Sequence, residues 1–176
     1  MKLYICCSAS NNIPQNIIDD CKILLNKLLK ENDLVFGAGD TGLMGISYEI
    51  AKKNNRKVTG ICPTFYKEKL KNLNCDKEII TNEMLDSTLK IIKNSDAIIV
   101  LPGGFGTIYE IFTAIQSKIC DEHNLPIIIY NSCNYYDELI KFIEETYKLN
   151  FAKENIKEKY VITNNKEEML NIIKNI

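Results

Sequence analysis

The segment Pro102-Gly103-Gly104-Phe105-Gly106-Thr107 has the composition of a loop that holds a phosphate. Its glycines let the backbone approach an anion without an obstructing Cβ atom and adopt positive φ values. The segment that follows is expected to be a helix, whose free N–H groups and dipole attract negative charge. The Thr107 hydroxyl can add a donor. We therefore predict that a phosphoryl group binds to the following residues: Gly103, Gly104, Phe105, Gly106 and Thr107.

Two further segments carry small and polar residues, Cys7-Ser8-Ala9-Ser10-Asn11-Asn12 and Gly37-Ala38-Gly39-Asp40-Thr41-Gly42. The spacing Gly37-x-Gly39-x-x-Gly42 matches the dinucleotide fingerprint, in which a pyrophosphate lies at a helix start. NAD is not expected, because the following strand ends in Cys62-Pro63-Thr64 and supplies no acidic residue for the ribose. Simple turn formation is the alternative for each glycine-rich segment. Two glycine-rich segments at one edge of the sheet, together with a serine-rich third, favour a ligand site.

Glu110 has two interpretations that the sequence leaves open. The spacing Thr107-x-x-Glu110 is that of a capping box, in which the two side chains bind each other's backbone N–H groups. Alternatively, the carboxylate lies within one helical turn of the phosphate loop and acts on a bound ribose. It could then stabilise positive charge on the sugar or polarise an attacking water.

The elements that position these residues follow from alternating apolar runs and amphipathic segments. The runs predict strands at residues 3–7, 34–36, 58–62, 78–80, 97–101, 127–130 and 160–162, and the amphipathic segments predict helices at 14–30, 45–53, 84–93, 108–118, 136–149 and 166–174. Strands that are apolar throughout are covered on both faces. We expect an α/β chain with a Rossmann-like, doubly wound, mainly parallel sheet and helices on both faces, forming a single domain over residues 1–176. Ligands of such sheets bind beyond the carboxyl ends of the strands.

Composition excludes several classes of function. A net charge of −1, with Arg56 as the only arginine, gives no basic surface for nucleic acid. No apolar stretch is long enough to span a membrane, and the first residues predict a strand rather than a signal peptide. We expect a cytoplasmic protein. The seven scattered cysteines predict buried, reduced thiols, and the single His123 predicts a loop position, so no metal site is expected.

Pro102–Glu110 resembles the Pro-Gly-Gly-x-Gly-Thr-x-x-Glu signature of the LOG (Lonely guy) family, whose members are often misnamed lysine decarboxylases. Cys7–Ser10 stands where that family has a Gly-Ser-Ser-type loop, and Gly37–Gly45 is similar to its Gly-Gly-Gly-x-x-Gly-Leu-Met-Gly segment. The resemblance covers nearly the whole chain. It implies a homodimer that hydrolyses a nucleoside 5′-monophosphate to free base and ribose 5-phosphate, without a cofactor. Its residues are the catalytic Glu110 and the substrate- or phosphate-binding Ser8, Gly39, Gly42, Met44 and Ser87, besides the loop.

The chain departs from the family pattern upstream of the signature. Ser87 and Thr88 stand where the family has an Arg-Lys pair, and Tyr109 replaces the first residue of a Glu-Glu pair. A hydroxyl cannot supply the planar, bidentate charge of an arginine. Lys90, one helical turn from Ser87, is a candidate substitute, whereas Arg56 is expected in a solvated turn. One alternative is a non-catalytic binder or carrier of a nucleotide or other phosphorylated ligand, as in molybdenum-cofactor carriers. Another is a related transferase or glycosidase with an altered substrate, such as a pyrimidine or deoxyribose nucleotide. Lysine decarboxylation is not expected, because nothing marks a pyridoxal phosphate site.

Overall fold

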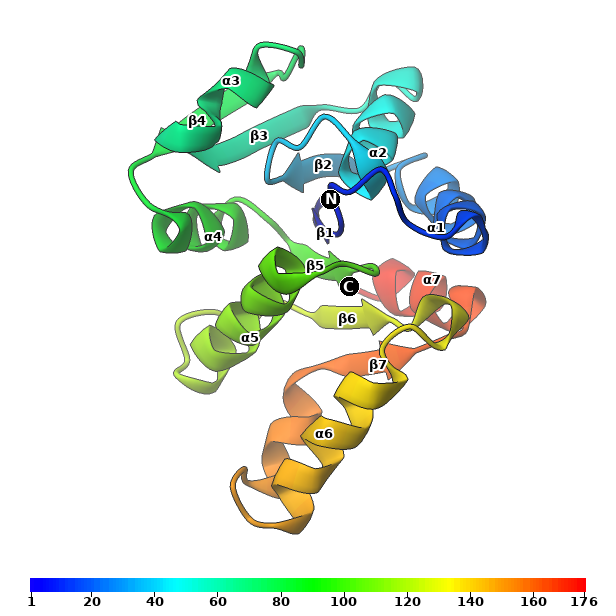
Figure 1. The fold of residues 1–176 in the computed structure, drawn as a ribbon, viewed down its shortest axis with the longest axis vertical. Coiled ribbons are helices and arrows are strands. Elements are labelled where there is room, and N and C mark those ends of the chain that lie inside the picture. Colours follow the sequence, from blue (N-terminus) through cyan, green and yellow to red (C-terminus); the bar gives the residue numbers. More distant parts are fainter.

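The computed structural model describes residues 1–176 and contains one seven-stranded sheet with helices on both faces (Figure 1). The strands are β1 (Lys2–Cys6), β2 (Asp33–Phe36), β3 (Val58–Pro63), β4 (Lys77–Thr81), β5 (Ala97–Val100), β6 (Ile127–Tyr130) and β7 (Val161–Thr163). Their order is β4-β3-β2-β1-β5-β6-β7, and every neighbouring pair is parallel. The predicted single-domain, Rossmann-like α/β fold is confirmed.

The helices are α1 (Gln15–Leu28), α2 (Gly42–Lys53), α3 (Lys67–Leu70), α4 (Met84–Lys93), α5 (Phe105–Ile119), α6 (Asp137–Lys148) and α7 (Lys166–Lys174). Short 3-10 turns cover Thr64–Tyr66, Ser132–Asn134 and Glu154–Lys159. Every predicted strand and helix is present, but α2 and α5 begin three residues earlier than expected. Both begin in a glycine-containing segment that we assigned to a loop. Glycine has a low helix propensity, so the sequence pattern placed both helix starts after these segments. Helix α3 was not predicted.

The two faces of the sheet bury separate apolar clusters, because alternate residues of a strand point to opposite faces. Leu3 and Ile5 of β1 belong to the larger cluster, with residues of α1, α2 and α7. Tyr4 and Cys6 belong to the smaller cluster, with residues of α4 and α5. The apolar residues of α1 that recur at steps of three and four lie in the core: Ile17, Cys21, Leu24, Leu25 and Leu28 are buried. No helix combines the length and apolarity needed to cross a membrane.

The histidine and the arginine lie as expected, whereas the prediction that the cysteines are buried is confirmed only in part, because Cys75 is half-buried and Cys120 and Cys133 are exposed. His123 occupies the loop after α5, where its Nε2 atom is 2.9 Å from the Ala114 carbonyl oxygen and its Nδ1 atom accepts the Leu125 N–H. Arg56 precedes β3, at the edge of the sheet opposite the strands' carboxyl ends, and donates to the Asn54 carbonyl. All seven cysteines are free, and four of them are buried.

Candidate functional site

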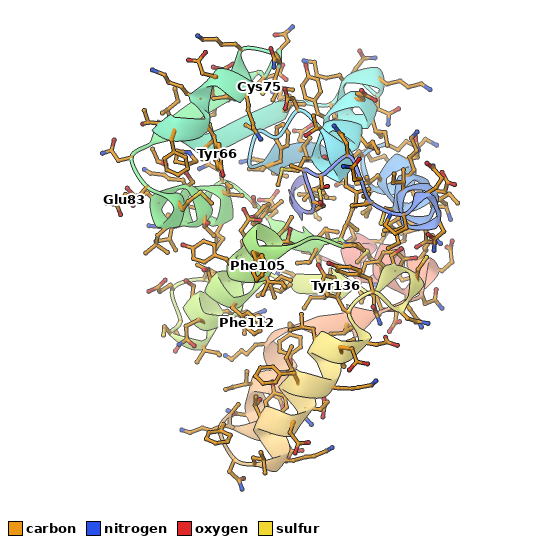
Figure 2. The ribbon with its side chains drawn as sticks, viewed as in Figure 1. Tyr66, Cys75, Glu83, Phe105, Phe112 and Tyr136 are labelled. Carbon is orange, nitrogen blue, oxygen red and sulfur yellow. The ribbon has the colours of Figure 1, made fainter.

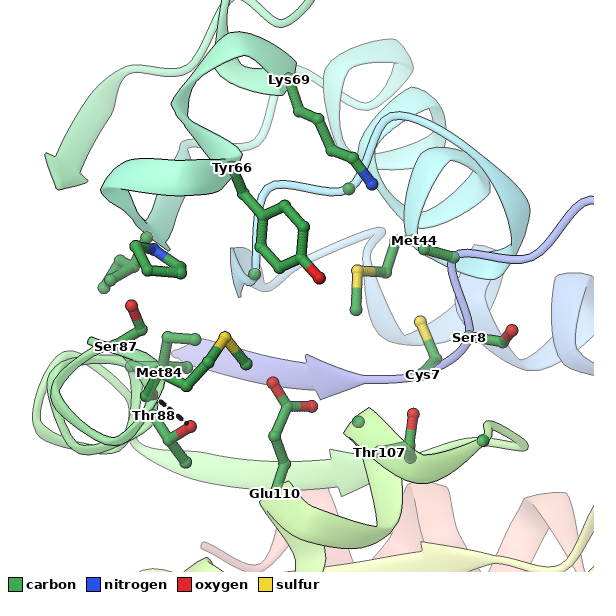
Figure 3. A pocket seen from close by; sticks show the side chains of 18 residues that line it. Cys7, Ser8, Met44, Tyr66, Lys69, Met84, Ser87, Thr88, Thr107 and Glu110 are labelled. Carbon is green, nitrogen blue, oxygen red and sulfur yellow. Dashed lines mark hydrogen bonds between the residues drawn. The ribbon is translucent and has the colours of Figure 1, made fainter. Parts of the chain in front are cut away.

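A cavity of about 260 Å³ opens at the carboxyl ends of β1, β2, β3 and β5 (Figure 3). This position is the edge at which ligands of open parallel sheets bind. The three loops singled out in the sequence all contribute to its wall, together with α3, α4 and α5. Its volume lies just below the usual range of small-molecule sites, about 300–1,000 Å³.

Hydrogen bonds join the three loops to one another. The Ser8 N–H donates to the Pro102 carbonyl (3.1 Å), and the Met44 N–H donates to the Ser8 carbonyl (3.1 Å). The Thr41 hydroxyl donates to the Ala9 carbonyl (2.6 Å). Segments far apart in the sequence therefore form one connected rim around the cavity.

The loop after β5 divides into residues that line the cavity and residues that support it. Gly104, Gly106 and Thr107 line it. A Cβ atom on Gly104 or Gly106 would meet no atom within 4 Å, so both leave the backbone open to the cavity. A Cβ on Gly103 would lie 2.0 Å from the Thr107 Oγ1 atom, and the Gly103 carbonyl accepts the Tyr135 hydroxyl (2.9 Å). Gly103 therefore shapes the loop from outside the cavity.

Phe105 is the first residue of α5, and its side chain is 95% exposed and does not line the cavity. Only its backbone N–H, which lies in the first turn and has no partner within the helix, remains available for an anion. The predicted phosphate contact of Phe105 can therefore involve only its backbone amide and not its side chain.

The loop after β2 also contains both residues that line the cavity and residues that support the loop from outside it. Gly39 and Met44 line the cavity with Gly37, whereas Gly42 does not. Gly42 has φ +60°, and a Cβ there would lie 2.5 Å from the Ser10 carbonyl oxygen. Glycine at 42 thus permits a left-handed backbone and the close approach of the β1–α1 loop, a structural role rather than the predicted ligand contact.

The structure contradicts the capping-box interpretation of Glu110. The N-cap of α5 is Gly104, which makes no side-chain cap, and Thr107 is the third residue of the helix. Glu110 instead points from α5 into the cavity, with only 7% of its surface exposed (Figure 3). Its Oε2 atom accepts a hydrogen bond from the Cys6 thiol (3.0 Å).

The environment of Glu110 favours its neutral form. Burial raises the pKa of the carboxyl group, and the hydrogen bond from Cys6 offsets part of this rise. The Tyr4 hydroxyl, which is buried in the apolar cluster that also contains Cys6, makes no hydrogen bond within the protein. A carboxylate without a cationic partner in an apolar setting is typical of groups that exchange protons during catalysis.

Ser87 and Thr88 of α4 line the cavity and are buried. The Ser87 hydroxyl shares a hydrogen bond with the Thr81 hydroxyl, and the Thr88 hydroxyl donates to the Met84 carbonyl (3.1 Å). Both side chains are thus neutral and satisfied by the protein. The suggested substitute, Lys90, is exposed and does not line the cavity.

The wall also contains residues that were not identified from the sequence, among them two with polar groups. Tyr66 and Lys69, from the segment between β3 and β4, point into the cavity across from Glu110 (Figure 3). The Lys69 Nζ atom lies 5.1 Å from the centre of the Tyr66 ring. The spacing of three residues, one helical turn, was the only available signal, and it was missed because no helix was expected there.

Comparison with known proteins places the chain in a family. A family model described as "Possible lysine decarboxylase" matches residues 44–173. The Arabidopsis thaliana protein named cytokinin riboside 5′-monophosphate phosphoribohydrolase LOG3 is 30% identical over 159 residues, which cover 89% of this chain and 74% of the relative. A rice protein named probable cytokinin riboside 5′-monophosphate phosphoribohydrolase LOGL2 is 27% identical, over 96% of this chain and 70% of its own length.

Solved structures confirm the fold. The Moco carrier protein of Chlamydomonas reinhardtii superposes with a TM-score of 0.68 at 13% identity, covering 99% of this chain and 95% of the carrier. The molybdenum cofactor binding protein of Rippkaea orientalis gives the same TM-score at 16% identity, with the same two coverages. The match of the family model over most of the chain, the curated relatives and the signature around Glu110 lead to one conclusion: the chain belongs to the LOG family, which the model describes as possible lysine decarboxylases.

Proposed function

We propose that this protein hydrolyses the N-glycosidic bond of a nucleoside 5′-monophosphate and releases free base and ribose 5-phosphate. The observation that carries the proposal is the buried carboxyl group of Glu110, which faces a cavity whose wall includes the start of α5. The names of the curated relatives, phosphoribohydrolases of a riboside 5′-monophosphate, support the same reaction class.

The 5′-phosphate would bind at Gly104, Gly106 and Thr107, where unpaired N–H groups and the helix dipole favour an anion. Ser8, whose N–H donates to the Pro102 carbonyl at the start of this loop, also lines the cavity and can add a hydroxyl donor. Fixing the phosphate also fixes the ribose relative to Glu110, which removes much of the orientational entropy from the barrier.

Glu110 would act on the ribose in its ionised form. As the bond between C1′ and the base nitrogen breaks, its electron pair leaves with the base, and positive charge develops on the sugar. A carboxylate in a dry site stabilises that charge and can orient the water that adds to C1′. The water's proton leaves to solvent or to the departing base nitrogen. Because the reaction needs the carboxylate, activity should rise as pH passes through the raised pKa of Glu110.

The base would lie against the apolar part of the wall. The apolar residues Met44, Ile61, Met84 and Ile91 line the cavity. Flexible methionine side chains adapt to ligands of different shape. This surface suits a flat, largely apolar heterocycle.

A second candidate function is a non-catalytic carrier of a nucleotide or another phosphorylated ligand. The neutral, hydrogen-bonded side chains of Ser87 and Thr88 favour it, because α4 then supplies no positive charge to the reaction. The phosphate-binding part of the site would be the same in both functions.

One experiment separates the two functions. The purified protein is mixed with each common nucleoside 5′-monophosphate, and ribose 5-phosphate release and binding heat are both measured. Release from at least one nucleotide supports the hydrolase, and binding to these ligands without release supports the carrier. Absence of both binding and release refutes the proposal.

We also propose a homodimer that forms through α5 and α6. Phe112, Phe142 and Phe151 are exposed and line one groove between α5 and the α6 region (Figure 2 shows Phe112 on α5). Apolar clusters of this kind on a soluble protein mark interaction sites. Light scattering should give twice the mass of one chain, and Phe142→Glu should reduce it to one. A wild-type protein with the mass of a single chain would refute the dimer.

A further inference from the structure

We propose that Lys69 binds the phosphate of the nucleotide, completing a site whose other half is the start of α5. This inference rests on the proposed function and adds to it a residue and a basis for specificity. Lys69 would make the protein select phosphorylated ligands over the corresponding nucleosides.

The cavity wall contains two charged side chains, one of each sign. It is the only lysine or arginine that lines the cavity, and Glu110 is the only acidic residue that does so. The two side chains approach from opposite walls, with Tyr66 and Met44 between them (Figure 3). An anionic ligand therefore has one side chain of opposite charge to meet, and that side chain is Lys69.

The ammonium group of Lys69 is not engaged by the protein. Its one specific contact is the face of the Tyr66 ring, at 5.1 Å, and it forms neither a hydrogen bond nor an ion pair. Asp40, an acidic residue in the loop after β2, accepts a hydrogen bond from the Asn72 amide instead (2.7 Å). Lys69 is a half-buried residue that lines the cavity, and its ammonium group forms no ion pair with Glu110 or any other acidic side chain, so it is available to a ligand.

The segment that carries Lys69 is held over the cavity by its neighbours. Leu70 is buried and packs on β3, where a Cβ on Gly60 would lie 2.9 Å from a Leu70 methyl group. The Thr64 hydroxyl donates to the Thr81 carbonyl (2.9 Å), which joins the start of the segment to the end of β4. These contacts direct Tyr66 and Lys69 toward the cavity. Their position is thus built into the fold.

The long stem of a lysine lets its ammonium move toward an anion while the stem stays on the aromatic ring. A phosphate bound at Gly104, Gly106 and Thr107 would then receive backbone N–H groups from one side and the Lys69 ammonium from the other. A nucleoside, which lacks this charge, would gain nothing from Lys69.

The test compares binding of ribose 5-phosphate, AMP and adenosine by the full chain and by three variants. Lys69→Gln should weaken binding of both phosphorylated ligands about 10-fold or more, the usual cost of losing a charge-assisted hydrogen bond, and leave adenosine unchanged. Lys69→Arg should keep most of the affinity. The matched control is Lys67→Gln, which removes the same charge from the same short helix at an exposed position outside the cavity.

Each outcome decides a separate point. If Lys69→Gln binds ribose 5-phosphate as tightly as the wild type, the inference is wrong and the proposed function stands. If Lys69→Gln and Lys67→Gln weaken binding equally, the effect is one of overall charge and the inference is also wrong. If the wild type binds none of the three ligands, both the inference and the proposed function fail. Thermal unfolding of each variant confirms that it is folded.

Discussion

Replacing Gly104 by valine tests the phosphate site with little disturbance of the fold. The position has φ −89°, outside the left-handed region, and a Cβ there would meet no atom within 4 Å. The cost to folding is then limited to a β-branched residue at the N-cap of α5, about 1 kcal/mol. For a chain of this length, that corresponds to a fall in melting temperature of about 2–4 °C.

The effect on ligand binding should be far larger. The isopropyl group of Gly104→Val would occupy space in front of the first N–H groups of α5, which hold the phosphate in the proposed site. Two hydrogen bonds to a charged group at about 1.5–3 kcal/mol each amount to at least about 3 kcal/mol, or a loss of affinity of about 100-fold or more.

Calorimetric titration with ribose 5-phosphate, paired with thermal unfolding, measures both effects in one preparation. Gly104→Ala adds only one methyl group and should give an intermediate affinity, so the three proteins form a graded series. A folded Gly104→Val protein that binds ribose 5-phosphate within about threefold of the wild type would show that the phosphate does not lie at the start of α5.

Three further predictions concern Glu110 and Gly42. Glu110→Gln should reduce turnover at least about 100-fold, the usual contribution of a catalytic acid or base, and calorimetry should show little change in ribose 5-phosphate binding. Turnover within a few-fold of the wild type would limit Glu110 to a structural role. Burial raises the pKa of Glu110 above 4.5, so the wild type should lose stability relative to Glu110→Gln as pH rises through that raised value. The two melting temperatures should converge below pH 4.5. A melting-temperature difference that stays constant across pH would contradict this. Gly42→Ala should destabilise the fold by about 2–3 kcal/mol in urea denaturation. The added Cβ would sit on a left-handed backbone and lie 2.5 Å from the Ser10 carbonyl oxygen. An unchanged denaturation midpoint would refute that account.

The central strands β5 and β6 could be predicted because both are apolar and buried along their whole length. A strand such as Ile127–Tyr130, buried at every residue, differs from the amphipathic segments beside it without any tertiary information. The three loops were identified for a related reason. In a parallel sheet, the residues that follow the strands must gather at one edge, so their small and polar character pointed to a shared site before the geometry was known.

The details of the site depended on tertiary contacts that spacing does not encode. The pair Thr107 and Glu110 has the spacing of a capping box, but α5 begins at Phe105 and turns Glu110 toward Cys6, a residue 104 positions away in the chain. Lys69 was missed because its place depends on how the connection between β3 and β4 folds over Gly60. Glycines that contact a ligand and glycines that permit close packing look alike in sequence. Only the structure separated Gly104 from Gly103 and Gly42.

The pairing of β1 with β5, from Leu3 opposite Ala97 to Cys6 opposite Val100, divides the sheet into two halves. One half contains β1 to β4 and supplies Ser8, Gly39 and Lys69, whereas the other contains β5 to β7 and supplies Thr107 and Glu110. A ligand in the cavity would therefore contact both halves of the sheet. Its binding free energy would oppose any opening of the structure that separates β1 from β5. Amide hydrogen exchange along β1 and β5 should slow when the site is occupied. The bound ligand would then stabilise the pairing of the two halves of the sheet.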